Sequence, residues 1–215
     1  MTIHNMILSD FMGFLFAMLA ITNPASSLGV FLGMTDDKSI SDRKRIAVIA
    51  TITIFIVLMV IAWAGIPILK MFGISLPAFQ ITGGLIILLR GLEMLNAKET
   101  PTTKTASALE DQARHSIAIV PLALPIIAGP GAMTNVIVFG TQFPGFVNTL
   151  YISIGVFIVT LVLGLVMYYA TYIGKLIGPT GIKIMTRIMG LILAAMAMSM
   201  ITSGLLKIFP SWGVP

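Results

Sequence analysis

The sequence contains no cysteine and few charged residues. Only 10% of its 215 residues are Asp, Glu, Lys or Arg, whereas a soluble domain carries about 25%. Without cysteine there is no disulfide, thiolate or haem-attachment chemistry, and the redox compartment stays open. Because 57% of the residues are hydrophobic, the chain has little with which to cover a surface that faces water. We therefore expect residues 1–215 to form a single transmembrane domain.

Catalytic constellations are also missing. The two histidines, His4 and His115, and all eight acidic residues lie in predicted loops or at the edges of apolar segments. There is no HExxH motif, intramembrane aspartate pair or Ser/His arrangement. We expect no enzyme, no metal site and no cofactor. The net charge of +5 does not indicate nucleic-acid binding, because the basic residues lie between apolar segments, where they orient a membrane protein.

Six apolar segments are long enough to cross a bilayer, which takes roughly 20 residues each. They are residues 7–34, 46–69, 76–95, 115–140, 147–174 and 184–208. Six spans place both termini on one side, which then holds Lys70 and Lys207, while the other 11 of the 13 basic residues fall on the opposite side. Since basic loops remain cytoplasmic, we expect a multi-pass protein of the cell (inner) membrane with both termini extracytoplasmic.

The two halves of the chain are related by an internal repeat. A shift of 106 residues aligns Pro24 with Pro130 and the segment 84–86 with the identical segment 190–192. Each half holds three spans, so the second half must enter the membrane from the opposite side. This predicts an all-α membrane protein built as a 3+3 inverted repeat, a construction common among secondary transporters. The predicted repeats are residues 7–95 and residues 115–208.

Proline interrupts the first and fourth spans near their middle, at Asn23-Pro24 and at Gly129-Pro130-Gly131. Proline disfavours a continuous helix by about 3 kcal/mol, whereas Asn is a preferred N-cap and Pro a preferred first residue. We predict that one helix ends near Ile21-Thr22 and a second begins at Asn23. An equivalent break is predicted at Gly129, where glycine permits unusual backbone angles.

Two such breaks would form a binding site without any charged side chain. The N-termini of the restarted helices suit a carboxylate, and the carbonyl ends of the preceding halves suit an ammonium group or a metal cation. A single proline kink often binds nothing, so the prediction depends on the breaks being paired. The predicted substrate-binding residues are Thr22, Asn23, Pro24, Ala25, Ser26, Ser27, Gly129, Pro130, Gly131, Ala132 and Thr134. No carboxylate lies at mid-span for a proton relay, and either a proton or sodium could serve as coupling cation.

Glycines and polar residues elsewhere in the spans have structural interpretations. Gly83-Gly84 and Gly190 are expected to pack the third and sixth spans against the broken helices, and small residues at 25, 29 and 33 to form a packing face. Gln80 is expected to bridge two helices. Arg187 is expected to snorkel toward the lipid headgroups.

Four segments resemble the MarC family of membrane proteins: ITNPASSLGVFLGMT, FGISLPAFQITGGLIILLRGLEML, VPLALPIIAGPGAMTNVIV and GIKIMTRIMGLIL. The likeness extends over about residues 10–205, and the string from Pro121 to Gly131 is its most specific part. The resemblance implies a six-span transporter of small neutral amino acids such as glycine and alanine. Relatives often carry a basic residue where this chain has Gln80. The expected partners are the substrate and the lipid bilayer, and a homo-oligomer is compatible with the sequence.

The leading functional hypothesis is a secondary transporter that works by alternating access. A second hypothesis is a small-solute channel, since Asn23-Pro24-Ala25 spells the NPA signature of aquaporins. Its partner here is Gly-Pro-Gly, however, and Ala132 follows where the channel pattern has arginine. An exporter of a different solute and a membrane scaffold are also compatible with the composition, although a scaffold does not explain paired breaks in mid-span.

Overall fold

The computed structural model describes residues 6–35, 38–95 and 129–212. Within these residues the chain is all-helical, with no strand. The helices are α1 (Leu8–Thr22), α2 (Pro24–Met34), α3 (Ile40–Met71), α4 (Leu76–Leu95), α7 (Pro130–Gln142), α8 (Phe146–Tyr168) and α9 (Ala170–Ile208), followed by the short 3-10 helix η2 (Pro210–Trp212).

Five stretches of the described chain are long and apolar enough to cross a membrane. They are Leu8–Met34, Ile40–Met71, Leu76–Leu95, Phe146–Tyr168 and Thr180–Ile208. Four of these agree closely with predicted spans. Of the predicted fourth span, 115–140, the part before residue 129 lies outside the described residues, and the remainder forms α7.

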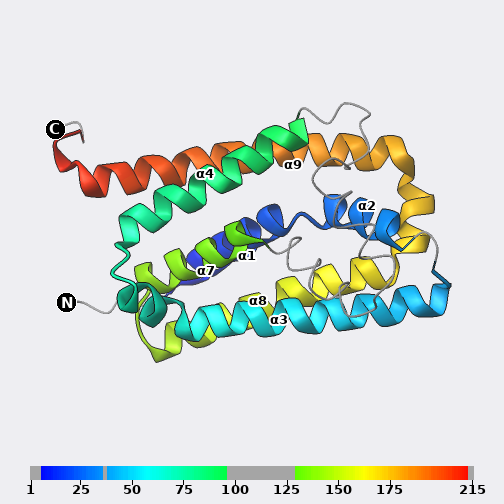
Figure 1. Ribbon diagram of the computed structural model, residues 1–215, viewed down its shortest axis with the longest axis horizontal. Coiled ribbons are helices and arrows are strands. Elements are labelled where there is room, and N and C mark those ends of the chain that lie inside the picture. Colours follow the sequence, from blue (N-terminus) through cyan, green and yellow to red (C-terminus); the bar gives the residue numbers. More distant parts are fainter. Residues whose placement is uncertain (1–5, 36–37, 96–128, 213–215) are drawn as a thin grey trace.

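The fifth predicted span, 147–174, extends too far. Helix α8 ends at Tyr168, and Gly178 interrupts the following helix α9 with φ 69° and ψ 168°. Only glycine adopts a positive φ of this kind readily. Residues 170–177 therefore form a short helical segment at the turn into the last span, which Figure 1 shows at one end of the molecule. Its apolar residues made it look like a continuation of the fifth span.

The second and fifth spans, α3 and α8, pack side by side and antiparallel. The ring centroids of Phe55 and Phe157 are 5.9 Å apart, and those of Trp63 and Phe146 are 5.6 Å apart. The Trp63 indole also donates a hydrogen bond of 3.2 Å to the Ser153 hydroxyl. Edge-on aromatic pairs of this kind contribute beyond the area they bury.

The third and sixth spans, α4 and α9, meet through glycines. A Cβ atom added to Gly91 would lie 2.9 Å from the carbonyl oxygen of Gly190, and one added to Gly190 would lie 2.9 Å from the carbonyl oxygen of Gly91. One added to Gly84 would lie 3.0 Å from the Ala197 carbonyl oxygen. The prediction that Gly84 and Gly190 pack against the broken helices is therefore wrong, because both lie where the α4 and α9 backbones touch.

The other small-residue predictions have mixed outcomes. Gly83 does contact a restarted helix, since a Cβ there would overlap the Thr134 side chain of α7. On α2, a Cβ at Gly29 would make an ordinary contact of 3.7 Å with Ile182, and one at Gly33 would meet nothing within 4 Å. Among the described residues, the packing face expected along α2 therefore has a contact at Gly29 and none at Gly33.

The elements α1, α2 and α7 lie between these two helix pairs (Figure 1). Buried side chains from α1, α2, α3, α7 and α8 form the main apolar core, with Phe14, Met18, Phe31 and Val156 among its least exposed members. The core therefore surrounds the broken first span, which holds the break inside protein. A break in lipid would leave backbone groups unpaired, which costs several kcal/mol each.

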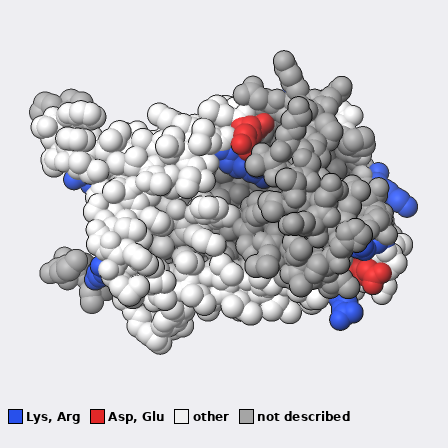
Figure 2. Space-filling view, in the orientation of Figure 1, with Lys and Arg blue, Asp and Glu red and all other residues white. Residues whose placement is uncertain are grey.

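Charged side chains gather at the two ends of the molecule, and one acidic and one basic patch lie side by side on the surface between them (Figure 2). At one end, the Lys44 ammonium lies 4.9 Å from the centroid of the Tyr168 ring. At the other end, the Lys207 ammonium donates a 3.3 Å hydrogen bond to Oε1 of the buried Gln80. This bond joins α9 to α4 and confirms the predicted bridging role of Gln80.

Candidate binding site at the helix breaks

The first span is interrupted at Asn23, between α1 and α2. Asn23 is 3% exposed and has φ 41° and ψ 81°, a left-handed conformation that Asn tolerates better than most residues. Its Oδ1 atom accepts a 3.1 Å hydrogen bond from the Ser26 amide, as an N-cap does. Pro24 follows as the first residue of α2, where a missing N–H costs nothing. The sequence Asn-Pro therefore ends one helix and starts the next.

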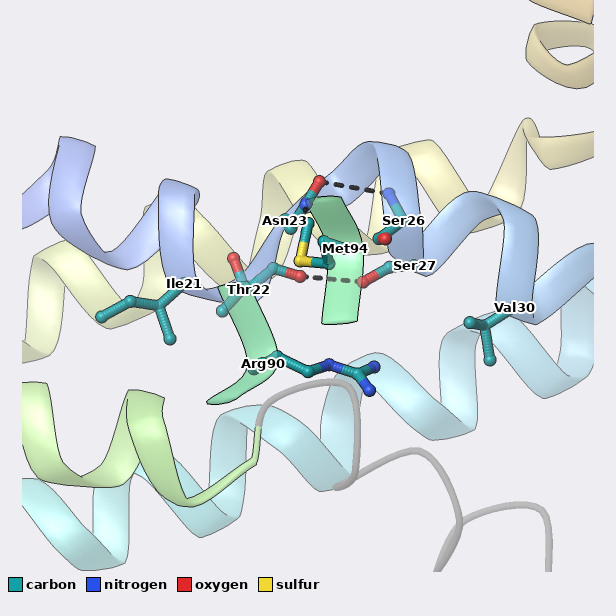
Figure 3. Close-up of a pocket in the computed structure, with 8 residues that line it drawn as sticks. All are labelled: Ile21, Thr22, Asn23, Ser26, Ser27, Val30, Arg90 and Met94. Carbon is teal, nitrogen blue, oxygen red and sulfur yellow. Dashed lines mark hydrogen bonds between the residues drawn. The ribbon is translucent and has the colours of Figure 1, made fainter. Parts of the chain in front are cut away.

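Two hydroxyl groups lie at the same break. The Thr22 hydroxyl donates to the Met18 carbonyl at 2.8 Å, and the Ser27 hydroxyl donates across the break to the Thr22 carbonyl at 2.8 Å (Figure 3). Because each hydroxyl has one hydrogen and two lone pairs, both oxygens retain lone pairs with which to accept. The break can therefore offer hydrogen-bond acceptors to a ligand that carries N–H groups.

Within the predicted fourth span, helix α7 begins at Pro130. Gly129 precedes it with φ −64° and ψ −166° and provides no side-chain cap. This is ordinary extended backbone, which proline favours in the residue before it. The prediction that Gly129 provides unusual backbone angles is therefore wrong. The predicted helical half before Gly129 lies outside the described residues.

The two helix starts lie close together and point in opposite directions. From the middle of the fold, α2 runs toward the beginning of α3, and α7 runs toward the beginning of α8, at the other end (Figure 1). A Cβ atom added to Gly131 would lie 3.3 Å from the Ile21 side chain, so the start of α7 touches the end of α1. Each helix start carries a partial positive charge, and both charges are concentrated in this region.

Helix α4 contacts both the break at Asn23 and the start of α7. The Asn23 side-chain amide donates to the sulfur of Met94 at 3.8 Å, a long contact to a weak acceptor. About two turns earlier on α4, the Ile87 side chain lies 2.7 Å from the position of a Cβ on Gly131. Arg90 stands between these two contact residues in the sequence.

Two pockets open at these contacts. The first, which we call the Asn23 pocket, has a volume of about 30 Å³ (Figure 3). It is lined by Ile21, Thr22, Asn23, Ser26, Ser27, Val30, Arg90 and Met94. The second, which we call the Pro130 pocket, has a volume of about 290 Å³. Its lining includes Ile21, Ile87, Arg90, Glu93, Gly129, Pro130 and Gly131. Ile21 and Arg90 line both pockets.

The predicted site residues divide into two groups. Seven line a pocket: Thr22, Asn23, Ser26, Ser27, Gly129, Pro130 and Gly131. Pro24, Ala25, Ala132 and Thr134 line neither. Ala132 is fully buried, and the Thr134 hydroxyl donates to the Pro130 carbonyl at 2.9 Å while its side chain packs on Gly83. These two residues therefore pack α7 in place.

Sequence reasoning missed Arg90 as a site residue. Its charge places it with the basic residues that orient the chain, and the sequence predicts a site that contains no charged side chain. The available signal was its depth, because Arg90 lies five residues before the end of α4, and an ionised residue inside a span usually serves function. Asn135, on α7, was also missed. It is 3% exposed, and its Nδ2 atom has no hydrogen-bond partner among the described residues.

These features define an α-helical integral membrane protein with several spans and an internal polar site. The sequence pattern of the family described as "MarC family integral membrane protein" matches residues 8–209. The chain therefore belongs to the MarC family.

Similar proteins come from distant organisms. The chain is 38% identical over 189 residues to a membrane protein of Pyrococcus horikoshii, covering 87% of this chain and 90% of the relative. It is 33% identical over 209 residues to the inner membrane protein MarC of Citrobacter koseri, covering 92% and 95%. It is 32% identical over 203 residues to the membrane protein YhcE of Escherichia coli, covering 92% of each. No solved structure matches the chain.

Proposed function

We propose that this protein is a secondary transporter of small neutral amino acids such as glycine and alanine, with the substrate bound at the two helix breaks. The observation that carries the proposal is the contact between the start of α7 and the end of α1, at Gly131 and Ile21, beside two pockets that share Ile21 and Arg90. Broken helices whose ends face a mid-membrane site are typical of transporters that bind charged or zwitterionic substrates.

The chemistry of the breaks suits a small zwitterion. The positive ends of α2 and α7 attract a carboxylate, and the oxygen atoms of Thr22 and Ser27 accept from an ammonium group. The Asn23 pocket is small, at about 30 Å³, which disfavours a long side chain on the substrate at that end. Glycine and alanine satisfy both conditions.

The packing of the helices supports an inverted repeat. Helix α2 packs against α9, and α7 packs against α4. In the predicted repeat, α2 is equivalent to α7, and α4 is equivalent to α9. The α2–α9 contact is therefore the equivalent of the α7–α4 contact. The α3–α8 pair corresponds to itself. Two halves related in this way can open a shared site to either side of a membrane in turn, which is the alternating-access mechanism.

The distribution of basic residues supports an orientation with both termini outside. The end of the molecule where α3 begins carries Arg43, Lys44 and Arg45, and the opposite end carries Lys70 and Lys207. Basic segments remain on the cytoplasmic side. The relative from Citrobacter koseri is named an inner membrane protein, and we propose the same membrane for this chain.

Uptake by proteoliposomes tests this proposal. The full chain is reconstituted, and entry of labelled glycine and L-alanine is followed under an imposed proton or sodium gradient, with protein-free liposomes as control. We expect saturable uptake that one of the two gradients drives and that excess unlabelled L-alanine inhibits more than D-alanine. Uptake no faster than in protein-free liposomes, or uptake that rises linearly with concentration, would contradict the proposal.

A further inference from the structure

Arg90 occupies an unusual position for a charged side chain. It lies inside α4, a helix that is long and apolar enough to cross a membrane. A charged group within a span is costly in hydrocarbon and usually faces a polar cavity or a partner. Arg187 lies within α9 and is exposed, but it lines neither pocket. The two arginines therefore differ in what they face.

The neighbours of Arg90 on α4 contact the two breaks. Ile87, three residues before it, packs on Gly131 at the start of α7, and Met94, four residues after it, accepts from Asn23. Residues at these spacings share one face of a helix. Arg90 lines both pockets, and its side chain extends past Thr22 and Ser27 (Figure 3). One guanidinium group thus serves both halves of the site.

Most of the N–H donors of the Arg90 guanidinium are not used by its ion pair. Its Nη1 atom forms an ion pair of 3.2 Å with Oε2 of Glu93, and the two side chains are 52% and 68% exposed. An exposed pair of this kind contributes little, because holding two long side chains in one geometry offsets their attraction. A guanidinium carries five N–H donors, so most of them are available to a ligand. An incoming carboxylate can therefore displace Glu93 or share the guanidinium with it.

We propose that Arg90 is the residue that binds the carboxylate of the transported substrate, and that Glu93 holds the guanidinium while the site is empty. This rests on the proposed function. The planar guanidinium matches a carboxylate with two parallel hydrogen bonds, which a lysine ammonium cannot reproduce. The positive ends of α2 and α7 act in the same direction. The site then selects for a carboxylate, and a small amine that lacks one is excluded.

Transport by Arg90→Gln and Arg90→Lys in proteoliposomes tests the proposal, with Arg187→Gln as the matched control. The glutamine variant should raise the KM for glycine about tenfold to a hundredfold, as expected for loss of a charged hydrogen bond. The lysine variant should fall between it and the wild type. Arg187→Gln should stay within about twofold of the wild type, because Arg187 faces neither pocket. Glu93→Gln should lower the KM, since it removes the group that competes with the substrate.

Competition distinguishes a binding role from a structural one. In the wild type, acetate and propionate should inhibit glycine uptake, whereas glycinamide, which lacks the carboxylate, should not. Size-exclusion profiles and thermal unfolding of each variant check folding. Equal KM values for Arg90→Gln and the wild type, or inhibition by glycinamide as strong as by unlabelled glycine, would overturn the role of Arg90.

The two proposals fail in different ways. If the wild type takes up no glycine or alanine, the proposed function and this inference both fall. If the wild type and Arg187→Gln take up glycine and Arg90→Gln does so equally well, only the role of Arg90 falls. Should Arg90→Gln not fold, the lysine variant and the glycinamide competition in the wild type give the decision.

Discussion

The break at Asn23 and the helix start at Pro130 lie close together, yet different contacts hold them. At Asn23 the polar side chains of the break itself supply the contacts, through the bonds from the Ser26 amide to Asn23 Oδ1 and from the Ser27 hydroxyl to the Thr22 carbonyl. At Pro130 there is no side-chain cap. That helix start is held by close packing of glycines against neighbouring helices, at Gly131 and Gly83.

This difference teaches where each half of the site is vulnerable. A break built by local hydrogen bonds is weakened when a side chain is removed. A helix start built by close packing is weakened when atoms are added, because a packed interior does not yield readily. Removing side-chain atoms should therefore weaken the break at Asn23, whereas adding side-chain atoms should weaken the start of α7.

The largest effect is expected for Gly131→Leu. A Cβ there already lies 2.7 Å from Ile87, so a leucine would push α7 from α4 and enter the Pro130 pocket. Glycine uptake should fall by at least a hundredfold, which corresponds to about 2.8 kcal/mol at 1.4 kcal/mol per tenfold. The control is Gly33→Leu, where a Cβ meets nothing within 4 Å among the described residues, and uptake should be near normal. Equal uptake by both variants would contradict the expectation that added side-chain atoms disrupt the site at Gly131 and not at Gly33.

Gly83→Ala should have the next largest effect, on stability. Its new Cβ would overlap the Thr134 side chain, and overpacking of this kind should cost about 2.5 kcal/mol, seen as a lower midpoint of thermal unfolding in detergent. Gly140→Ala is the control on α7 itself, since its Cβ would lie 3.6 Å from Ile66, an ordinary contact. Unchanged unfolding of Gly83→Ala would show that α4 and α7 leave room for a methyl group at this contact.

Asn23→Ala should cost less, about 2 kcal/mol, from loss of the cap and from the left-handed backbone that alanine disfavours. Asn23→Gly should be much less destabilising, because glycine accepts φ 41° and replaces a cap at a cost of only a few tenths of a kcal/mol. Unfolding midpoints of the two variants give the comparison. If both were equally destabilised, the backbone conformation would not contribute.

Gly129→Ala should have the smallest effect. With φ −64° and ψ −166°, the backbone suits any residue, so the change in unfolding free energy should stay within about 1 kcal/mol, and it can be stabilising. Measured beside Asn23→Ala, it tests directly whether backbone conformation matters at one break and not at the other. A loss as large as that of Asn23→Ala would contradict the comparison.

The sequence predicted best the features that depend on neighbouring residues. The end of α1 and the start of α2 follow from Asn23 and Pro24, because capping and the missing proline amide act over a few residues. The long apolar runs likewise predicted the spans that the structure describes. Gln80 was correctly expected to bridge helices, since a buried amide among apolar residues requires a partner.

Features that depend on which helices meet were predicted poorly. The glycines at 84 and 190 are recognisable as packing residues, but their partner is set by tertiary structure, which pairs α4 with α9. Arg90 resembles an orientation signal in the sequence, because its charge suits a helix end near the cytoplasm. Its position beside the break at Asn23 and the start of α7 becomes visible only when Ile87 and Met94 are seen against Gly131 and Asn23.

The glycine contacts between α4 and α9 also restrict how the protein can change shape. At Gly91 and Gly190 the two backbones touch with no side chain between them, so there is no flexible layer to absorb sliding. The two helices would have to move together as one rigid body, and Arg90 on α4 would move with them. Any opening of the pockets must then occur where α4 and α9 contact α7 and α2. The Arg90 guanidinium would then move relative to the break at Asn23.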